Sequence, residues 1–101
     1  MKHYYFLIVL SFTLISCASR TYHLPNQLNE ISGIDDAFRS AYFSINDSGD
    51  GPFVYIMNED GGSILHKMFV SGTDNIDWED LSTDGEFLYI GDIGNNRNQR
   101  R

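Results

Sequence analysis

The sequence has a single cysteine among its 101 residues, so an internal disulfide is excluded and the folded part must be held together by packing. Basic residues are also scarce. Arg39 and Lys67 are the only two between residues 21 and 96, a region that holds all 14 acidic residues. Because such a surface repels phosphate backbones, we expect no nucleic-acid partner. The same region shows little helical periodicity, which argues against a helical fold.

The longest hydrophobic run lies at the N-terminus and is too short to cross a membrane. About a dozen mostly apolar residues follow Lys2 and His3, whereas a spanning helix needs about 20. An apolar run of this length behind a basic start predicts a secretory signal segment. The run ends in the sequence LISC at residues 14–17, which resembles the bacterial lipobox.

The lipobox resemblance implies a lipoprotein signal peptide at residues 1–16, cleaved before Cys17. The Cys17 thiol would then carry a diacylglycerol, and two or more acyl chains, palmitate among them, are enough for stable membrane anchoring. Residues 17–29 are predicted to be a tether. Since Ala18 is not the aspartate associated with inner-membrane retention, we expect the bacterial cell envelope and its outer membrane, on either face. An ordinary signal peptide, or a buried apolar strand, is the alternative reading of this run.

After the tether, short β-rich runs alternate with turn sequences. Four runs come first, and glycine, asparagine, aspartate or proline separates them. Two more runs follow. The six are residues 30–37, 40–47, 52–59, 63–70, 76–83 and 87–94. This pattern predicts an all-β fold of antiparallel four-stranded units.

The pattern restarts after about 45 residues, which is the period of a β-propeller blade. We therefore expect a first blade at residues 30–75 and the first two strands of a second at 76–101, about one and a half blades in total. A propeller closes its ring with roughly four to eight blades. The sequence thus reads as a fragment or truncated product of a longer protein. A complete small β-meander, or a part that assembles with other chains, is the competing reading.

Three motifs carry a family resemblance: NDSG at 46–49, DWED at 77–80 and YIGDIG at 89–94. Together they resemble a group of bacterial secreted or lipid-anchored propeller proteins, similar to the six-bladed TolB-like and NHL-type propellers. Asn95 departs from the family pattern, in which an aspartate is common. A weaker likeness links the strand openings to gluconolactonase- and regucalcin-like propellers. That likeness implies that an acid at the start of a blade reaches a divalent ion in the channel.

Acidic residues at strand starts and strand ends form the candidate metal site. If the two units pack as neighbouring blades, four carboxylates converge on one rim and suit calcium, since no paired histidines suggest zinc. The predicted ligands are Glu30, Asp47, Glu79 and Asp92, with possible ligand contacts from Asp77, Trp78 and Asp80. The alternative is that aspartate and asparagine next to glycine only form turns. Trp78 also suits a core position.

The sequence predicts a non-catalytic binding or interaction module of the envelope, with a protein, a glycan or a divalent cation as its partner. The alternative is the N-terminal fragment of a metal-dependent hydrolase of the lactonase or esterase type. Paired carboxylates can run such chemistry when their pKa values are pushed apart, but nothing in the sequence distinguishes an acid from a base. Whether the chain is an enzyme therefore stays open at this point, and no catalytic residue is assigned.

Overall fold

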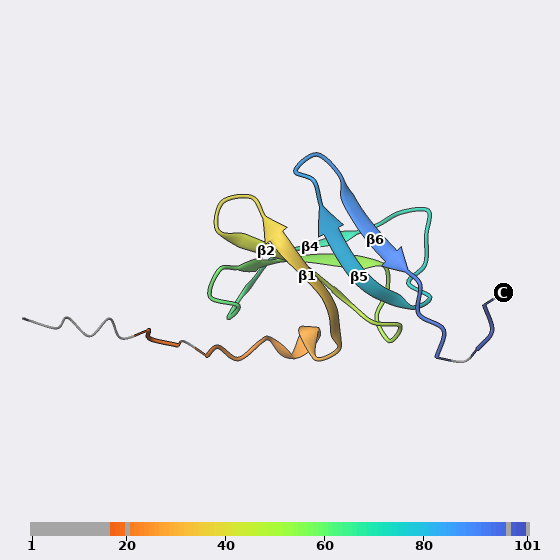
Figure 1. Cartoon of the computed structure of the whole chain (residues 1–101), viewed down its shortest axis with the longest axis horizontal. Helices are drawn as coiled ribbons and strands as arrows, with labels where there is room; N and C mark the ends of the chain where they lie inside the picture. Colours follow the sequence, from red (N-terminus) through yellow and green to blue (C-terminus); the bar gives the residue numbers. More distant parts are fainter. Residues whose placement is uncertain (1–16, 20, 97, 101) are drawn as a thin grey trace, which may run out of the picture.

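A computed structural model describes residues 17–19, 21–96 and 98–100 (Figure 1). The predicted signal peptide at residues 1–16 lies outside the described residues. Within the described part of the chain, no helix is long and apolar enough to cross a membrane.

The fold is all-β, as the sequence predicted. A four-stranded antiparallel sheet has the order β1-β2-β3-β4, and a two-stranded antiparallel sheet joins β5 to β6. The two sheets correspond to about one and a half blades. The strands are β1 (Ile31–Ala37), β2 (Ala41–Asn46), β3 (Phe53–Asn58), β4 (Ile64–Phe69), β5 (Trp78–Thr83) and β6 (Leu88–Asp92). A 3-10 turn, η1 (Asn26–Leu28), precedes them.

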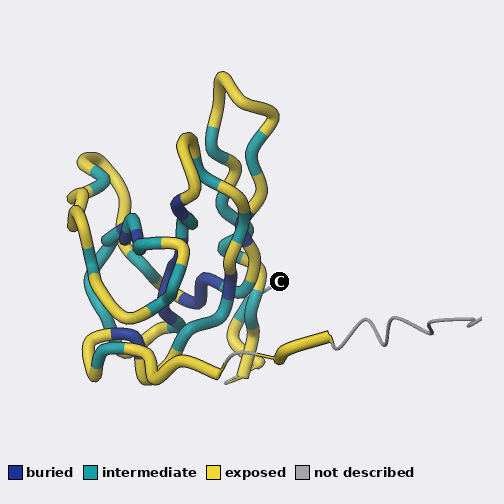
Figure 2. The backbone as a smooth tube through the Cα atoms, turned by 90° about the vertical axis from the view of Figure 1, so that its left-hand side faces the viewer, coloured by how far each residue is buried: buried dark blue, intermediate teal, exposed yellow. Residues whose placement is uncertain are grey.

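The two sheets pack through their first strands, and β1 lies beside β5 (Figure 1). Between the sheets lies a buried cluster of four side chains: Ile45, Val54, Trp78 and Leu81. Burying side chains of this size contributes about 1.5–3 kcal/mol each. Figure 2 shows these buried stretches inside the molecule, while the hairpin tips are exposed. The position of the second sheet relative to the first is therefore fixed by an apolar core.

Polar contacts reinforce the junction of the two sheets at both ends of β5. The Ser32 hydroxyl donates to the Trp78 carbonyl over 2.7 Å, and the Thr83 amide donates to the Asp35 carboxylate over 2.7 Å. Between them Gly33 lies so close to β5 that a Cβ there would be 2.9 Å from the Cβ of Leu81. Only glycine fits this approach without displacing β5.

The other face of the four-stranded sheet is covered by the segment that leads into β1. Leu28 is 1% exposed and packs in a second cluster with Tyr55 and Met57. The Asn46 side chain donates to the Gln27 carbonyl over 2.6 Å. The last residues of the predicted tether therefore belong to the packed fold.

A β-bulge occurs at the same place in the first strand of each sheet. In β1, Ile31 pairs with Asn46 but Gly33 pairs with Ile45, so Ser32 is the extra residue. In β5, Trp78 pairs with Asp92 but Asp80 pairs with Gly91, so Glu79 is the extra residue. A bulge redirects side chains locally. The shared bulge supports the repeat that the sequence spacing predicted.

Candidate metal centre

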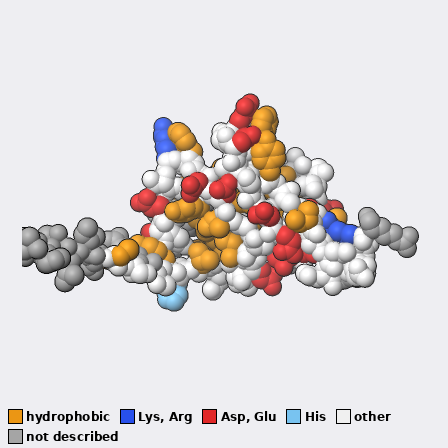
Figure 3. Space-filling view, in the orientation of Figure 1, with side chains coloured by type: hydrophobic (Ala, Val, Ile, Leu, Met, Phe, Trp, Pro, Cys, Tyr) orange, Lys and Arg blue, Asp and Glu red, His pale blue; other side chains and the backbone are white. Residues whose placement is uncertain are grey.

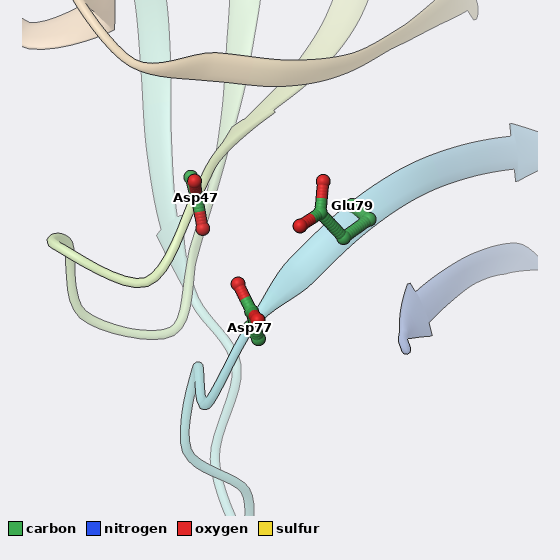
Figure 4. A group of neighbouring side chains, drawn as sticks. All are labelled: Asp47, Asp77 and Glu79. Carbon is green, nitrogen blue, oxygen red and sulfur yellow. The ribbon is translucent and has the colours of Figure 1, made fainter. Parts of the chain in front are cut away.

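Three carboxylates come together where β2 ends and β5 begins. Asp47 follows β2, Asp77 directly precedes β5, and Glu79 is the bulge residue of β5. One oxygen of each lies within 4.8 Å of one oxygen of the other two, and Figure 4 shows the side chains turned toward a common space. This group, the acidic triad, could hold a metal ion.

The backbone positions of the triad are fixed by a bracing asparagine. Asn75 donates from its side-chain amide to the carbonyls of Asn46 and Asp47, each over 3.0 Å. Its side-chain oxygen accepts from the Trp78 amide over 3.1 Å. One side chain therefore joins the loop after β2 to the start of β5, and the distance between Asp47 and the other two acids is set by this link.

Asp77 is the most constrained member of the triad. Its side chain is 6% exposed, and Oδ1 is buried without a hydrogen-bond partner among the described residues. The other oxygen accepts only a long bond of 3.4 Å from the Asn96 amide. A buried carboxylate oxygen without a partner is costly, and a bound cation at this position would satisfy it.

The three carboxylates of the triad carry like charges at short distances. The hydrogen bond from the Ser48 amide holds the pKa of Asp47 below its ordinary value. Partial burial, followed by the negative charges of Asp47 and Asp77, raises the pKa of Glu79. In the described part of the chain no ion pair reaches the triad. Figure 3 shows acidic side chains gathered on the surface over the start of β5.

A polar pocket of about 270 Å³ opens beside Asp77. Its walls come from the loop after β2, the segment before β5 and the segment after β6: Ser48, Ile76, Gly94, Asn95, Asn96, Gln99 and Arg100. The pocket leaves room for further oxygen atoms, from water or from a ligand, next to the triad. Such oxygens complete the coordination of a hard cation.

Two of the predicted ligands lie in the triad and two serve other contacts. Asp47 and Glu79 come together as described, with Asp77, which the sequence had placed only among possible ligand contacts. Asp92 accepts from the Asp77 amide over 3.0 Å and pairs with Arg100. Glu30 is exposed, its carboxylate lies beside Gly49, and its carbonyl accepts from the Asp47 amide over 2.9 Å.

The remaining predicted contacts lie away from the triad. Trp78 is 2% exposed and packs in the core between the sheets. Asp80 is exposed, and its carboxylate accepts from the Leu81 amide over 2.8 Å. Cys17, the predicted lipidation site, is exposed. Sequence reasoning did not identify Asn75, nor Gly94, which lies so close to the Asp77 carboxylate that no Cβ fits there. In the sequence, Asn75 is one of several polar residues in a turn and Gly94 is one of two glycines in the YIGDIG motif, so neither position stands out.

No family model, curated protein or solved structure matches the chain. The function is therefore argued from the residues and their geometry.

Proposed function

We propose that this chain is a non-catalytic binding module of the bacterial cell envelope, held to the membrane by lipid on Cys17 and organised around a calcium ion at the acidic triad. The observation that carries the cation proposal is the buried Oδ1 of Asp77, which has no hydrogen-bond partner in the described chain. It lies in a group whose two other carboxylates are within 4.8 Å. A divalent cation offsets two of the three negative charges and gives the buried oxygen a partner.

The ligand chemistry favours calcium over other divalent ions. The triad offers only carboxylate oxygens, whereas protein zinc sites nearly always include cysteine or histidine. Calcium takes six to eight oxygens in flexible geometry, and the adjoining polar pocket has room for those that the triad does not supply. Magnesium prefers a strict octahedral shell that keeps several waters. We therefore expect calcium to bind more tightly than magnesium.

The cation would act as a clamp between the two sheets. Asp47 belongs to the loop of the four-stranded sheet, and Asp77 and Glu79 belong to the start of the two-stranded sheet. An ion that binds only when these segments are together stabilises that arrangement by mass action, by about 2.7 kcal/mol at a hundredfold excess over Kd. The polar pocket beside the clamp is where a glycan or protein partner would contact the ion.

The envelope part of the proposal is supported by the sequence around Cys17 and by its exposure. The cysteine stands before the first strand, in a segment without regular structure. The motif resemblance to lipid-anchored propellers points the same way, and the bulge repeated in β1 and β5 fits a blade-like repeat. The acidic surface suits an extracytoplasmic role in which divalent cations are available.

The test is a calcium titration of the full-length chain purified in detergent, followed by calorimetry and by thermal unfolding. We expect saturable heat and a rise in Tm with calcium, and weaker effects with magnesium. Asp77→Asn should abolish both responses, because it removes the buried charge while keeping the size of the side chain. Asp60→Asn, at an exposed turn where the aspartate oxygen accepts from Gly62, is the matched control and should respond like the unmodified chain. Absence of heat and of any Tm change in the unmodified chain would refute calcium binding.

A further inference from the structure

A second cavity lies at the opposite end of the strands from the acidic triad. It has a volume of about 360 Å³ and opens between the tip of the β1–β2 hairpin and the tip of the β5–β6 hairpin. Ligand pockets begin at about 300 Å³, so this cavity suits a small molecule. In Figure 3 hydrophobic side chains stand beside charged ones at both hairpin tips.

The cavity has an aromatic lining and an acidic rim. Its floor is Phe43 and Leu88, which are partly buried and pack on the core between the sheets. Its walls are Phe38 and Phe87, which are 79% and 58% exposed. Asp36 and Glu86, both exposed, add two negative charges to the lining. Among the described residues no lysine or arginine lines this cavity.

The wall that Phe87 forms is held in place by hydrogen bonds. The Asp84 carboxylate accepts from the Phe87 amide over 2.8 Å and from the Glu86 amide over 2.9 Å. It also accepts from the Tyr89 hydroxyl over 2.8 Å. The ring of Tyr89 in turn packs against Phe87, with ring centroids 6.5 Å apart. A wall that is fixed before the ligand arrives loses less entropy on binding.

The opposite wall is presented by a strained turn. Arg39 and Ser40 have φ angles of 60° and 56°, a left-handed conformation that residues other than glycine seldom adopt. This turn holds Phe38 at the tip of the β1–β2 hairpin. The Arg39 guanidinium lies 4.9 Å from the centroid of the Phe38 ring, so this ring already forms one cation–π contact. The Asp35 bond to Thr83 keeps the two hairpins together.

We propose that the aromatic cavity binds a small, soluble quaternary-ammonium compound. Aromatic faces attract a weakly hydrated organic cation through the ring quadrupole, and aromatic cages for quaternary ammonium groups are built in this way. The rim carboxylates complement the positive charge, and the apolar floor accepts methyl groups. A metal ion would find too few oxygen ligands here. Asp36 and Glu86 disfavour a phosphate or carboxylate ligand, because their two negative charges outnumber the one positive charge of Arg39 beside Phe38.

The test measures choline binding to the full-length chain by chemical-shift changes in NMR spectra. 3,3-Dimethylbutan-1-ol, which has the shape of choline but no charge, is the matched ligand. We expect choline to shift amide signals at both hairpin tips and to bind about two- to fivefold more tightly than the alcohol, the factor that one exposed cation–π contact provides. Equal affinity for the two ligands, or shifts outside the hairpin tips only, would overturn the proposal.

Variants separate the cavity from general surface effects. Phe38→Ala removes an aromatic face and Glu86→Gln removes a rim charge, and each should weaken choline binding about two- to fivefold. Phe69→Ala and Glu59→Gln change an exposed phenylalanine and an exposed glutamate on the β3–β4 hairpin and should leave the affinity unchanged. Equal weakening in the control variants would also contradict the proposal. Choline binding should persist in EDTA, which makes this result independent of the calcium site.

Discussion

The backbone of Gly94 lies directly against the carboxylate of Asp77. A Cβ built at position 94 would overlap the Asp77 side chain and would lie 2.5 Å from a carboxylate oxygen of Glu79. The Gly94 amide also donates to the Asp77 carbonyl over 3.1 Å. The segment after β6 thus closes one side of the acidic triad, and only a residue without a side chain permits this approach.

Gly94→Ala should therefore weaken calcium binding by at least about tenfold, since the added methyl group displaces the Asp77 and Glu79 carboxylates from their common space. Calorimetric titration measures the effect. Gly91→Ala is the matched control, because a Cβ at position 91 has no neighbour closer than 3.5 Å. If the two variants bind calcium equally well, the triad is not the calcium site.

Acid stability should depend on Asp50, a residue of the loop between β2 and β3. Its carboxylate accepts from the Tyr55 hydroxyl over 2.5 Å, from the Asn46 side chain over 3.0 Å and from the Gly51 amide over 2.9 Å. Burial alone would raise the pKa of Asp50, but these bonds and the charge of Lys67 outweigh it and lower the pKa. The ionised form is therefore favoured in the folded chain.

A lowered pKa in the folded state means that Asp50 stabilises the fold above its unfolded pKa of about 3.9 and that this contribution is lost as the pH falls through the folded value. Asp50→Asn should reduce the free energy of unfolding by about 1–2 kcal/mol at neutral pH and by less in acid. Urea unfolding at a series of pH values checks this. A constant difference from pH 7 down to about pH 2.5 would contradict the assigned charge.

The junction of the two sheets can be tested at Gly33. Gly33→Ala places a methyl group 2.9 Å from the Cβ of Leu81 and 3.1 Å from Ile45, and such overpacking costs about 1–3 kcal/mol. Trp78 is the only tryptophan in the sequence and lies in this junction, so its fluorescence reports the change. Gly62→Ala, where a Cβ would have no neighbour closer than 3.4 Å, should leave both the emission and the unfolding midpoint unchanged.

Membrane anchoring should depend on Cys17 alone, because the sequence has no other cysteine. Cys17→Ala should abolish metabolic labelling with palmitate and release the chain from the membrane fraction, since the acyl chains supply the anchoring energy. Cys17→Ser tests the thiol specifically. Unchanged labelling in both variants would refute the lipobox interpretation.

The strands could be predicted from the sequence because their signals are local. Alternating apolar residues and glycine-rich turns fall where the six strands begin and end, and the spacing of about 45 residues anticipated the second unit. The proximity of the Asp47 and Glu79 carboxylates also follows from that spacing. Asp47 follows the second strand of the first unit and Glu79 lies near the start of the first strand of the second unit, so both lie at the same end of the two sheets.

Other parts of the site depend on contacts between distant segments, which a local pattern does not encode. A strict two-residue alternation cannot reveal that Glu79 is a bulge residue. Asp92 forms an ion pair with Arg100, and this ion pair requires that the chain turn back after β6. The bracing role of Asn75 likewise depends on the loop after β2.

The bulge that β1 and β5 share displays a different side chain in each sheet. In the first unit the extra residue is Ser32, whose hydroxyl fastens the neighbouring strand. In the second the extra residue is Glu79, which faces two other acids. The same bulge thus places a hydroxyl that hydrogen-bonds to β5 in the first sheet and a negatively charged carboxylate in the second. A first strand with this bulge can therefore display either role after one residue is replaced, without a change in the backbone that supports it.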